Sequence, residues 1–162
     1  STRTTTLFPY TTLFRSPEGE EGLIMTGTVF DSNIYISAIL FGGRPRRLLD
    51  LAIRGKLRVF ISPAIVSEIE EVLTGKKFGF SPEVVRSIIE EIGNITTMVV
   101  PEKRHSVVSR DSDDNIIIDC AVQAGVEYIV TGDNDLLALG SFGRVAIVGP
   151  LDFLSIVKGD EG

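Results

Sequence analysis

Five short, largely apolar runs alternate along the chain with segments of helical periodicity. The runs are residues 28–30, 57–61, 95–100, 128–130 and 145–148. They are mostly continuous rather than alternating in polarity, which is typical of strands covered on both faces. Strands that alternate with helices form a largely parallel sheet with helices packed against it. The sequence therefore predicts an α/β fold in which helices cover both faces of one sheet.

The helices between these strands are predicted from apolar periodicity and from their start and stop residues. Ser62-Pro63 and Ser81-Pro82 each place a capping residue before a proline that the first turn tolerates. Gly42, Gly55 and Gly125 follow helical segments, as residues that end helices do. The predicted helices are residues 33–41, 44–53, 63–73, 82–92, 113–124, 136–139 and 150–157.

Length and composition indicate one domain with a sizeable core. The chain has 162 residues, of which 43% are hydrophobic, and this length alone gives no reason for a second domain. Its apolar runs are far shorter than the roughly 20 residues of a membrane span. Cys120 is the only cysteine, so it has no partner for an internal disulfide. We therefore expect a soluble, cytoplasmic protein with no membrane association.

Residues 1–24 differ in character from the rest of the chain. They are rich in threonine and show no period of 2 or 3.6 residues. The segment resembles translated sequencing-adapter sequence, which is excluded from fold reasoning. A signal peptide is the alternative, but an uninterrupted apolar centre is missing. We expect residues 1–24 to be a non-native or disordered extension, residues 25–158 to form the domain, and residues 159–162 to fray.

Two acids directly follow predicted strands. Asp31 comes after residues 28–30, and Asp133 comes after residues 128–130. The carboxyl ends of parallel strands meet at one edge of the sheet, where open α/β proteins bind ligands. Taken singly, each aspartate more often serves a turn or a helix cap. Asp135 is an alternative cap for the short helix that follows.

Glu68 interrupts an apolar helical stripe. Ile65, Ile69 and Val72 mark one face of the helix that begins at Pro63, and Glu68 occupies the remaining position of that face. A buried carboxylate is costly unless it has a partner, a metal or access to water. The sequence leaves two interpretations open: a functional acid, or a side chain at the edge of the stripe that reaches solvent.

A further group of acids precedes the most apolar helix. Acids here are ordinary caps, because they favour the helix dipole. Asp114 shares a face with Ile117 and Ile118 and is therefore preferred for chemistry. Asp113 and Asp119 are lesser candidates, and Asp119 is expected to be solvated.

Acids gathered at one edge suit Mg²⁺ or Mn²⁺, which favour carboxylate and water oxygens. Such ions assist phosphodiester hydrolysis by lowering the pKa of a bound water. One histidine and one cysteine give little support for a zinc site. The net charge of −6 argues against a nucleic-acid partner, but bound cations reverse the local field.

Four motifs in order resemble a PIN domain, particularly the VapC-like toxin group. The resemblance covers about residues 28–157, and the motifs are Val29-Phe30-Asp31-Ser32-Asn33 with 37–43, Ser67-Glu68-Ile69, Asp113-Asp114-Asn115 with Ala121, and Val130-Thr131-Gly132-Asp133. The resemblance implies a three-layer α/β/α sandwich with a five-stranded, mainly parallel sheet. It implies Mg²⁺- or Mn²⁺-dependent cleavage of RNA, a homodimer and neutralisation by a cognate antitoxin.

The resemblance also assigns roles to residues. Asp31, Glu68, Asp114 and Asp133 would be the metal-binding acids. Ser32 and Asn33 would support the first of them, and Thr131 the last. Asp111, Asp113, Asp119 and Asp135 leave open which acid of each group is used. Residues 1–24 do not match the family.

Five basic residues are candidates for contact with the RNA backbone. Phosphate contacts of this kind give affinity without sequence information. A solvated positive edge is the alternative for each of them. We place them on the loop after the first helix and on a later loop: Arg44, Arg46 and Arg47, then Lys76 and Lys77.

Two other functions are considered. A catalytically weak PIN-like module would bind RNA or protein, and the intact set of four acids argues against it. A phosphoryl-handling receiver domain also gathers acids at strand ends. It would need an acid adjacent to Asp31 and a lysine at the end of the fifth strand, and both are missing.

Overall fold

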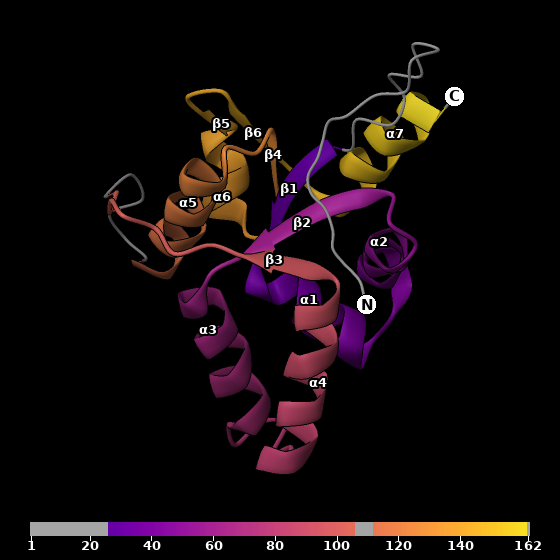
Figure 1. Cartoon of the computed structure of the whole chain (residues 1–162), viewed down its shortest axis with the longest axis vertical. Helices are drawn as coiled ribbons and strands as arrows, with labels where there is room; N and C mark the ends of the chain where they lie inside the picture. Colours follow the sequence, from indigo (N-terminus) through magenta and orange to yellow (C-terminus); the bar gives the residue numbers. More distant parts are fainter. Residues whose placement is uncertain (1–25, 106–111, 162) are drawn as a thin grey trace.

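The computed structural model describes residues 26–105 and 112–161 (Figure 1). The side chains of residues 112–114 and 159–161 lie outside this description. The extension predicted at residues 1–24 and the acid Asp111 also lie outside the described residues.

One sheet runs through the centre of the described chain. Its order is β3-β2-β1-β4-β6-β5, and all neighbouring strands are parallel except β5 and β6. The strands are β1 (Thr26–Phe30), β2 (Leu57–Ile61), β3 (Thr96–Met98), β4 (Tyr128–Val130), β5 (Ser141–Phe142) and β6 (Val145–Val148).

The predicted α/β class and mainly parallel sheet are confirmed, but the sheet has a sixth strand. The additional strand, β5, is two residues long and pairs antiparallel with β6. Gly143, in the turn between them, has a φ of 59°, a conformation that glycine adopts at little cost. A two-residue strand has too little periodicity to be recognised from sequence.

Seven helices lie within the described chain, six of them between strands and the last one after β6. Ser62 and Ser81 cap two of them, each accepting a hydrogen bond from the backbone N–H three residues later, as predicted. The helices are α1 (Ser32–Leu40), α2 (Gly43–Ile53), α3 (Pro63–Thr74), α4 (Pro82–Asn94), α5 (Ser112–Ala124), α6 (Asn134–Leu139) and α7 (Pro150–Glu161).

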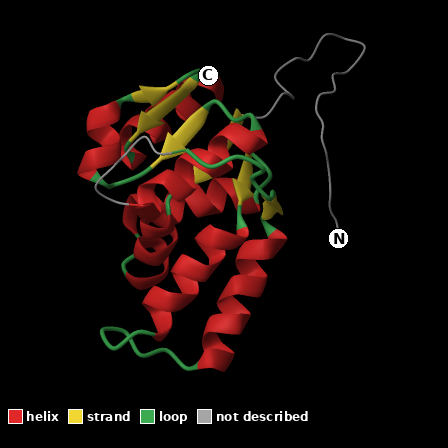
Figure 2. Ribbon diagram, turned by 90° about the vertical axis from the view of Figure 1, so that its left-hand side faces the viewer, coloured by secondary structure: helices red, strands yellow, loops and turns green. Residues whose placement is uncertain are grey.

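The helices form two layers around the sheet. Parallel crossovers are almost always right-handed, which places α1 to α4 on the face opposite α5 and α6. In agreement, α5 packs against β1, β2 and β4, whereas α2 packs against α1 and α7. Figures 1 and 2 show α3 and α4 extending together as a helical hairpin away from the sheet. The three-layer arrangement therefore holds.

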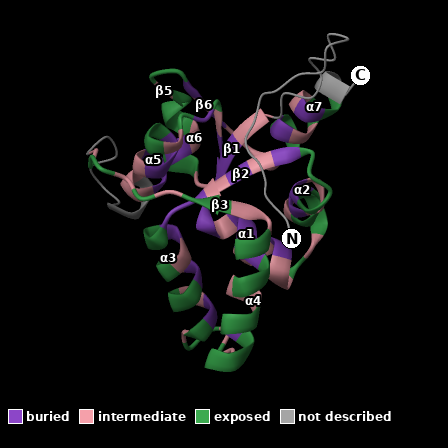
Figure 3. Cartoon of the chain, viewed as in Figure 1, coloured by how far each residue is buried: buried purple, intermediate pink, exposed green. Residues whose placement is uncertain are grey.

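The core lies between the sheet and these helices (Figure 3). Phe30, Tyr35 and Phe153 are its largest fully buried side chains. Tyr35 is therefore a core residue, whereas Ile36 and Ile39 are only partly buried and pack against the core. Within the described residues, no helix is both long and apolar enough to cross a membrane.

The packing predicts different costs for the same substitution at two helical isoleucines. Ile69 on α3 is fully buried, whereas Ile53 at the end of α2 is 54% exposed. We expect Ile69→Ala to lower the free energy of unfolding by about 2–5 kcal/mol, and Ile53→Ala to change it by no more than about 0.5 kcal/mol. Urea unfolding of the two variants measures both values. Equal losses would contradict this placement of α3.

Candidate functional site

The strand register brings the predicted acids of β1 and β4 to one edge of the sheet. Phe30 pairs with Val130, so the residues after them, Asp31 and Thr131, also lie side by side. The backbone N–H of Asp31 donates a hydrogen bond to the carbonyl of Val130 at 2.9 Å. β1 and β4 are neighbours in space although nearly a hundred residues separate them. The long-range parallel pairing therefore builds this site.

Asp31 is a buried carboxylate held by three side chains. Its residue is 5% exposed. Thr131 Oγ1 donates to Asp31 Oδ2 at 2.6 Å and Asn33 Nδ2 donates to the same oxygen at 3.2 Å, while Ser32 Oγ lies 3.5 Å from Oδ1. The contacts expected of Ser32 and Asn33 are thus present. They fix the carboxylate at the carboxyl end of β1.

Thr131 connects Asp31 to Asp133. Its hydroxyl donates to Asp31 and accepts from the backbone N–H of Asp133 at 2.9 Å. The sequence interpretation assigned Thr131 to the last acid alone, and the structure shows that it serves both. Asn33 adds a second link, because its Oδ1 accepts from the backbone N–H of Gly132 at 3.4 Å.

Asp133, and not Asp135, caps helix α6. Asp133 Oδ1 accepts from the backbone N–H groups of Asp135 and Leu136, at 2.7 and 3.2 Å. Asp135 lies exposed in the first turn. The capping role considered for Asp135 is therefore wrong, because α6 begins at Asn134 and Asp135 lies inside its first turn. The cap fixes the carboxylate of Asp133 near that of Asp31.

Burial raises the pKa of Asp31 above its ordinary value of 3.8. The negative charge of Asp133 acts in the same direction, and the hydrogen bond from Thr131 opposes both. Desolvation and a like charge both disfavour an ionised carboxylate. A cation bound beside Asp31 would relieve both penalties. The electrostatics therefore fit a positively charged ligand at this position.

Within the part of the chain that the structure describes, Glu68 and the acids of α5 are not grouped with Asp31 and Asp133. Glu68 is half-buried on α3 and lines a surface pocket of about 590 Å³ together with Ser67 and Ile116. Among the described residues, no three Asp, Glu, His or Cys side chains lie close enough to hold a metal ion. Asp113 and Asp114 belong to the first turn of α5, but their side chains are outside the described part. The structure thus brings Asp31 and Asp133 together and leaves the full set of four as a prediction.

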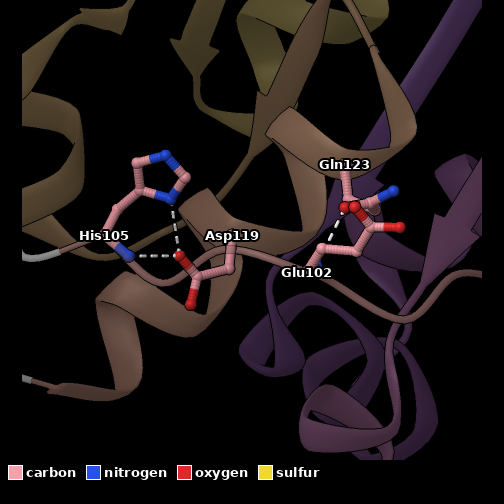
Figure 4. A network of polar contacts seen from close by, with 4 residues as sticks. All are labelled: Glu102, His105, Asp119 and Gln123. Carbon is pink, nitrogen blue, oxygen red and sulfur yellow. Dashed lines mark hydrogen bonds and ion pairs between the residues drawn. The ribbon is translucent and has the colours of Figure 1, made fainter.

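The prediction that Asp119 is solvated is wrong, because Asp119 binds His105 (Figure 4). Asp119 Oδ1 accepts from the backbone N–H of His105 at 2.7 Å and lies 2.8 Å from His105 Nδ1. The two side chains are 13% and 21% exposed. The segment after β3 runs along α5 and covers the face that periodicity assigned to solvent. The only local signal was the single histidine, which the sequence analysis considered only for a zinc site.

The five basic residues lie on α2 and beyond the end of α3. Arg44, Arg46 and Arg47 lie within the first five residues of α2 rather than in a loop, since α2 begins at Gly43. Arg46 pairs with Asp50 at 3.2 Å, one helical turn later. Lys76 and Lys77 are exposed beyond the end of α3, whose twelve residues span about 18 Å. Lys76 and Lys77 therefore lie far from the acidic site, whereas Arg44 lines a surface pocket with Gly149 and Pro150, which follow β6 at the same edge of the sheet.

Comparison with known proteins identifies the family. The PIN domain model matches residues 27–135, a segment that includes β1, the acid positions and the start of α6. This chain belongs to the PIN domain family. It is also 32% identical over 115 residues to the uncharacterized protein MJ1680 of Methanocaldococcus jannaschii, which covers 68% of this chain and 73% of that protein.

Two solved structures share the fold. A chain in the crystal structure of VapBC2 from Rickettsia felis, bound to a DNA fragment from its promoter, matches with a TM-score of 0.57 and 14% identity over 76% of this chain and 98% of that chain. PAE2754 from Pyrobaculum aerophilum matches with a TM-score of 0.55 and 14% identity, covering 83% and 90%. These similarities support the sheet and helix arrangement described above.

The raised pKa of Asp31 predicts a pH-dependent effect of Asp31→Asn. Ionisation of Asp31 costs more free energy in the folded state than in the unfolded state. The contribution of Asp31 to the free energy of unfolding therefore falls as pH rises from 3.8 through the folded-state pKa. We expect Asp31→Asn to stabilise the metal-free protein relative to the parent at neutral pH. This advantage should shrink as pH falls towards 3.8.

Thermal unfolding in EDTA across this pH range measures the effect. Asp135→Asn, an exposed carboxylate changed in the same way, should show no such trend. A stability difference for Asp31→Asn that moved in the opposite direction with pH would mean that the ionised carboxylate is net stabilising.

Proposed function

We propose that this protein is a metal-dependent endoribonuclease that hydrolyses RNA phosphodiester bonds, and that it is the toxin of a toxin–antitoxin pair. One observation carries the proposal. In a PIN domain, a family whose members are generally nucleases, Asp31 is buried at the carboxyl edge of the sheet beside a second acid, Asp133. That arrangement costs folding energy and gains its value from a bound cation.

The donor chemistry suits Mg²⁺ or Mn²⁺. Both ions favour carboxylate oxygens, and Mg²⁺ typically keeps several waters and uses one or two carboxylates of the protein. Asp31 and Asp133 would hold the ion, with Glu68 and Asp114 completing the set. When bound, the ion would lower the pKa of a water and so supply the nucleophile for hydrolysis of the phosphodiester.

The protein's own groups would orient these acids. Thr131 and Asn33 both donate to Asp31 Oδ2, which fixes the plane of the carboxylate. Asp133 is held through Oδ1 by the first turn of α6. The hydrolysis needs no covalent intermediate on the protein, so these positions would act by binding and orientation.

The basic residues would bind the RNA backbone. Arg44, Arg46 and Arg47 on α2 and Lys76 and Lys77 beyond α3 remain candidates for contacts with its backbone. Lys76 and Lys77, beyond the far end of α3, suit parts of the strand that are remote from the scissile phosphate. Their contribution would be salt-dependent affinity rather than catalysis.

The proposed partner proteins are a cognate antitoxin and a second copy of this chain. The similar fold of a chain in the VapBC2 complex supports an antitoxin partner. The homodimer is proposed from the resemblance to the VapC-like group. We propose a cytoplasmic location on the same basis.

A catalytically weak RNA- or protein-binding module is the second candidate. One observation favours it: Glu68 does not join Asp31 and Asp133 in a three-acid group within the described residues. Failure of the protein to bind Mn²⁺ would support this candidate.

Cleavage of a labelled single-stranded RNA with Mn²⁺ or Mg²⁺ tests the function. We expect the parent to cleave and EDTA to stop it. Changes around metal ligands already cost roughly 10- to 100-fold, so Asp31→Asn and Asp133→Asn should lose about 100-fold or more. Asp135→Asn, two positions from Asp133 and exposed, is the matched control and should remain active. Equal activity in all four proteins would indicate a contaminating nuclease.

Binding of Mn²⁺ gives a separate readout. A ligand that binds only the folded state at about 100 times its dissociation constant stabilises by about 2.7 kcal/mol. We expect Mn²⁺ to raise the melting temperature of the parent and to have much less effect on Asp31→Asn. The same increase in both proteins would place the ion elsewhere and remove the basis of the metal assignment.

A further inference from the structure

A pocket of about 490 Å³ lies beside the proposed catalytic acids. We call it the His105 pocket, and it lies between the turn after β2, the segment that follows β3 and the N-terminal half of α5. The residues that matter here are Ser62, Pro101, Arg104, His105, Ile116 and Asp119.

The His105 pocket adjoins the acids on two sides. It shares Ala64 and Ile116 with the pocket that contains Glu68. Val29 pairs with Phe60, so Asp31 and Ser62 follow neighbouring parallel strands at the same level, and such strands are about 5 Å apart. A strand of RNA with its scissile phosphate at Asp31 would therefore reach this pocket with an adjacent nucleotide.

The wall of the pocket is ordered by contacts with α5 (Figure 4). The backbone N–H of Glu102 donates to Gln123 Oε1 at 2.9 Å, and His105 donates its own N–H to Asp119 at 2.7 Å. The His105 ring also packs edge-on against Phe142, with centroids 5.4 Å apart. Arg104 lies between these anchors in the sequence, so the backbone on both sides of it is held against α5.

The hydrogen bond to Asp119 also sets the chemistry of His105. A carboxylate only accepts hydrogen bonds, so Nδ1 of His105 carries the proton that lies between them. Both the ring and the backbone of His105 contact the same oxygen of Asp119. Asp119 therefore fixes the position of the segment and the orientation of the His105 ring.

The lining combines an aromatic ring, apolar surface and one cation. His105 supplies the ring, Pro101 and Ile116 the apolar surface, and Arg104 is exposed and cationic. Bases of single-stranded RNA stack on histidine rings and on guanidinium planes, and arginine binds phosphate. Such a lining suits a base and its phosphate better than a purely acidic or purely apolar ligand.

We propose that the His105 pocket is a nucleotide subsite, in which His105 and Arg104 bind the base and phosphate of a nucleotide adjacent to the scissile bond. The subsite rests on the proposed nuclease function and deepens it, because it names residues that would determine which RNA sequences are cut. None of the basic residues expected from sequence to bind RNA belongs to this pocket.

Lys103 offers a matched control for Arg104. It is also exposed and lies in the same segment, but it does not line the pocket. We expect Arg104→Ala to weaken binding of a fluorescein-labelled single-stranded RNA of mixed sequence by roughly 5- to 100-fold, as loss of a stacking or phosphate contact does. Lys103→Ala should change the affinity less than about twofold, since general electrostatic attraction is screened by salt.

Two variants of His105 separate stacking from folding. His105→Ala removes the ring and should weaken binding, whereas His105→Phe keeps an aromatic face and should retain most of the affinity. Urea unfolding of both variants reports any loss of structure from the missing bond to Asp119. Equal weakening by both would show that the bond to Asp119, rather than the ring face, matters and would overturn the stacking role.

Fluorescence anisotropy in Ca²⁺ measures the affinity for the labelled RNA, and a gel checks that the RNA stays intact. The cleavage assay in Mn²⁺ is run separately on the same proteins. Equal effects of Arg104→Ala and Lys103→Ala would overturn the subsite even if the parent cleaves RNA. A selective effect of Arg104→Ala without cleavage by the parent would support the subsite and overturn only the nuclease function. Unchanged RNA affinity in all variants would assign the pocket to another ligand, such as a segment of a partner protein.

Discussion

The hydrogen bond from Thr131 to the buried carboxylate of Asp31 is the interaction on which the site depends. It joins the ends of β1 and β4, and the same hydroxyl accepts the backbone N–H of Asp133. The sheet order places these strands side by side, and the cap of α6 fixes Asp133. A single threonine therefore holds two acids from distant parts of the chain at one edge.

This arrangement lowers the stability of the folded protein and would favour binding of a cation. Burial and the charge of Asp133 both disfavour ionised Asp31, while its three polar neighbours offset part of that cost. A protein selected only for stability would place an apolar residue here, because an uncompensated buried carboxylate is among the most costly groups in a core. The family to which the chain belongs gives a reason for keeping the acid, namely the cation that would compensate it.

Much of this structure follows from local patterns in the sequence. The apolar runs and the Ser-Pro caps before α3 and α4 marked the main strands and two helix starts, and Asp31 and Asp133 stood out because each follows a strand. Periodicity failed at Asp119, since it cannot show that the segment after β3 returns to cover α5. The double role of Thr131 was also hidden, because it depends on the pairing of β1 with β4, residues far apart in the chain.

The proposed function requires Asp31 and Asp133 to bind one divalent cation. A crystal structure of the protein soaked in Mn²⁺, with anomalous scattering used to locate the ion, would show whether they do. We expect an anomalous peak about 2.1 Å from carboxylate oxygens of both residues, close to the distance at which Mg²⁺ binds oxygen. An ion bound elsewhere, or no ion at this edge of the sheet at saturating Mn²⁺, would contradict it.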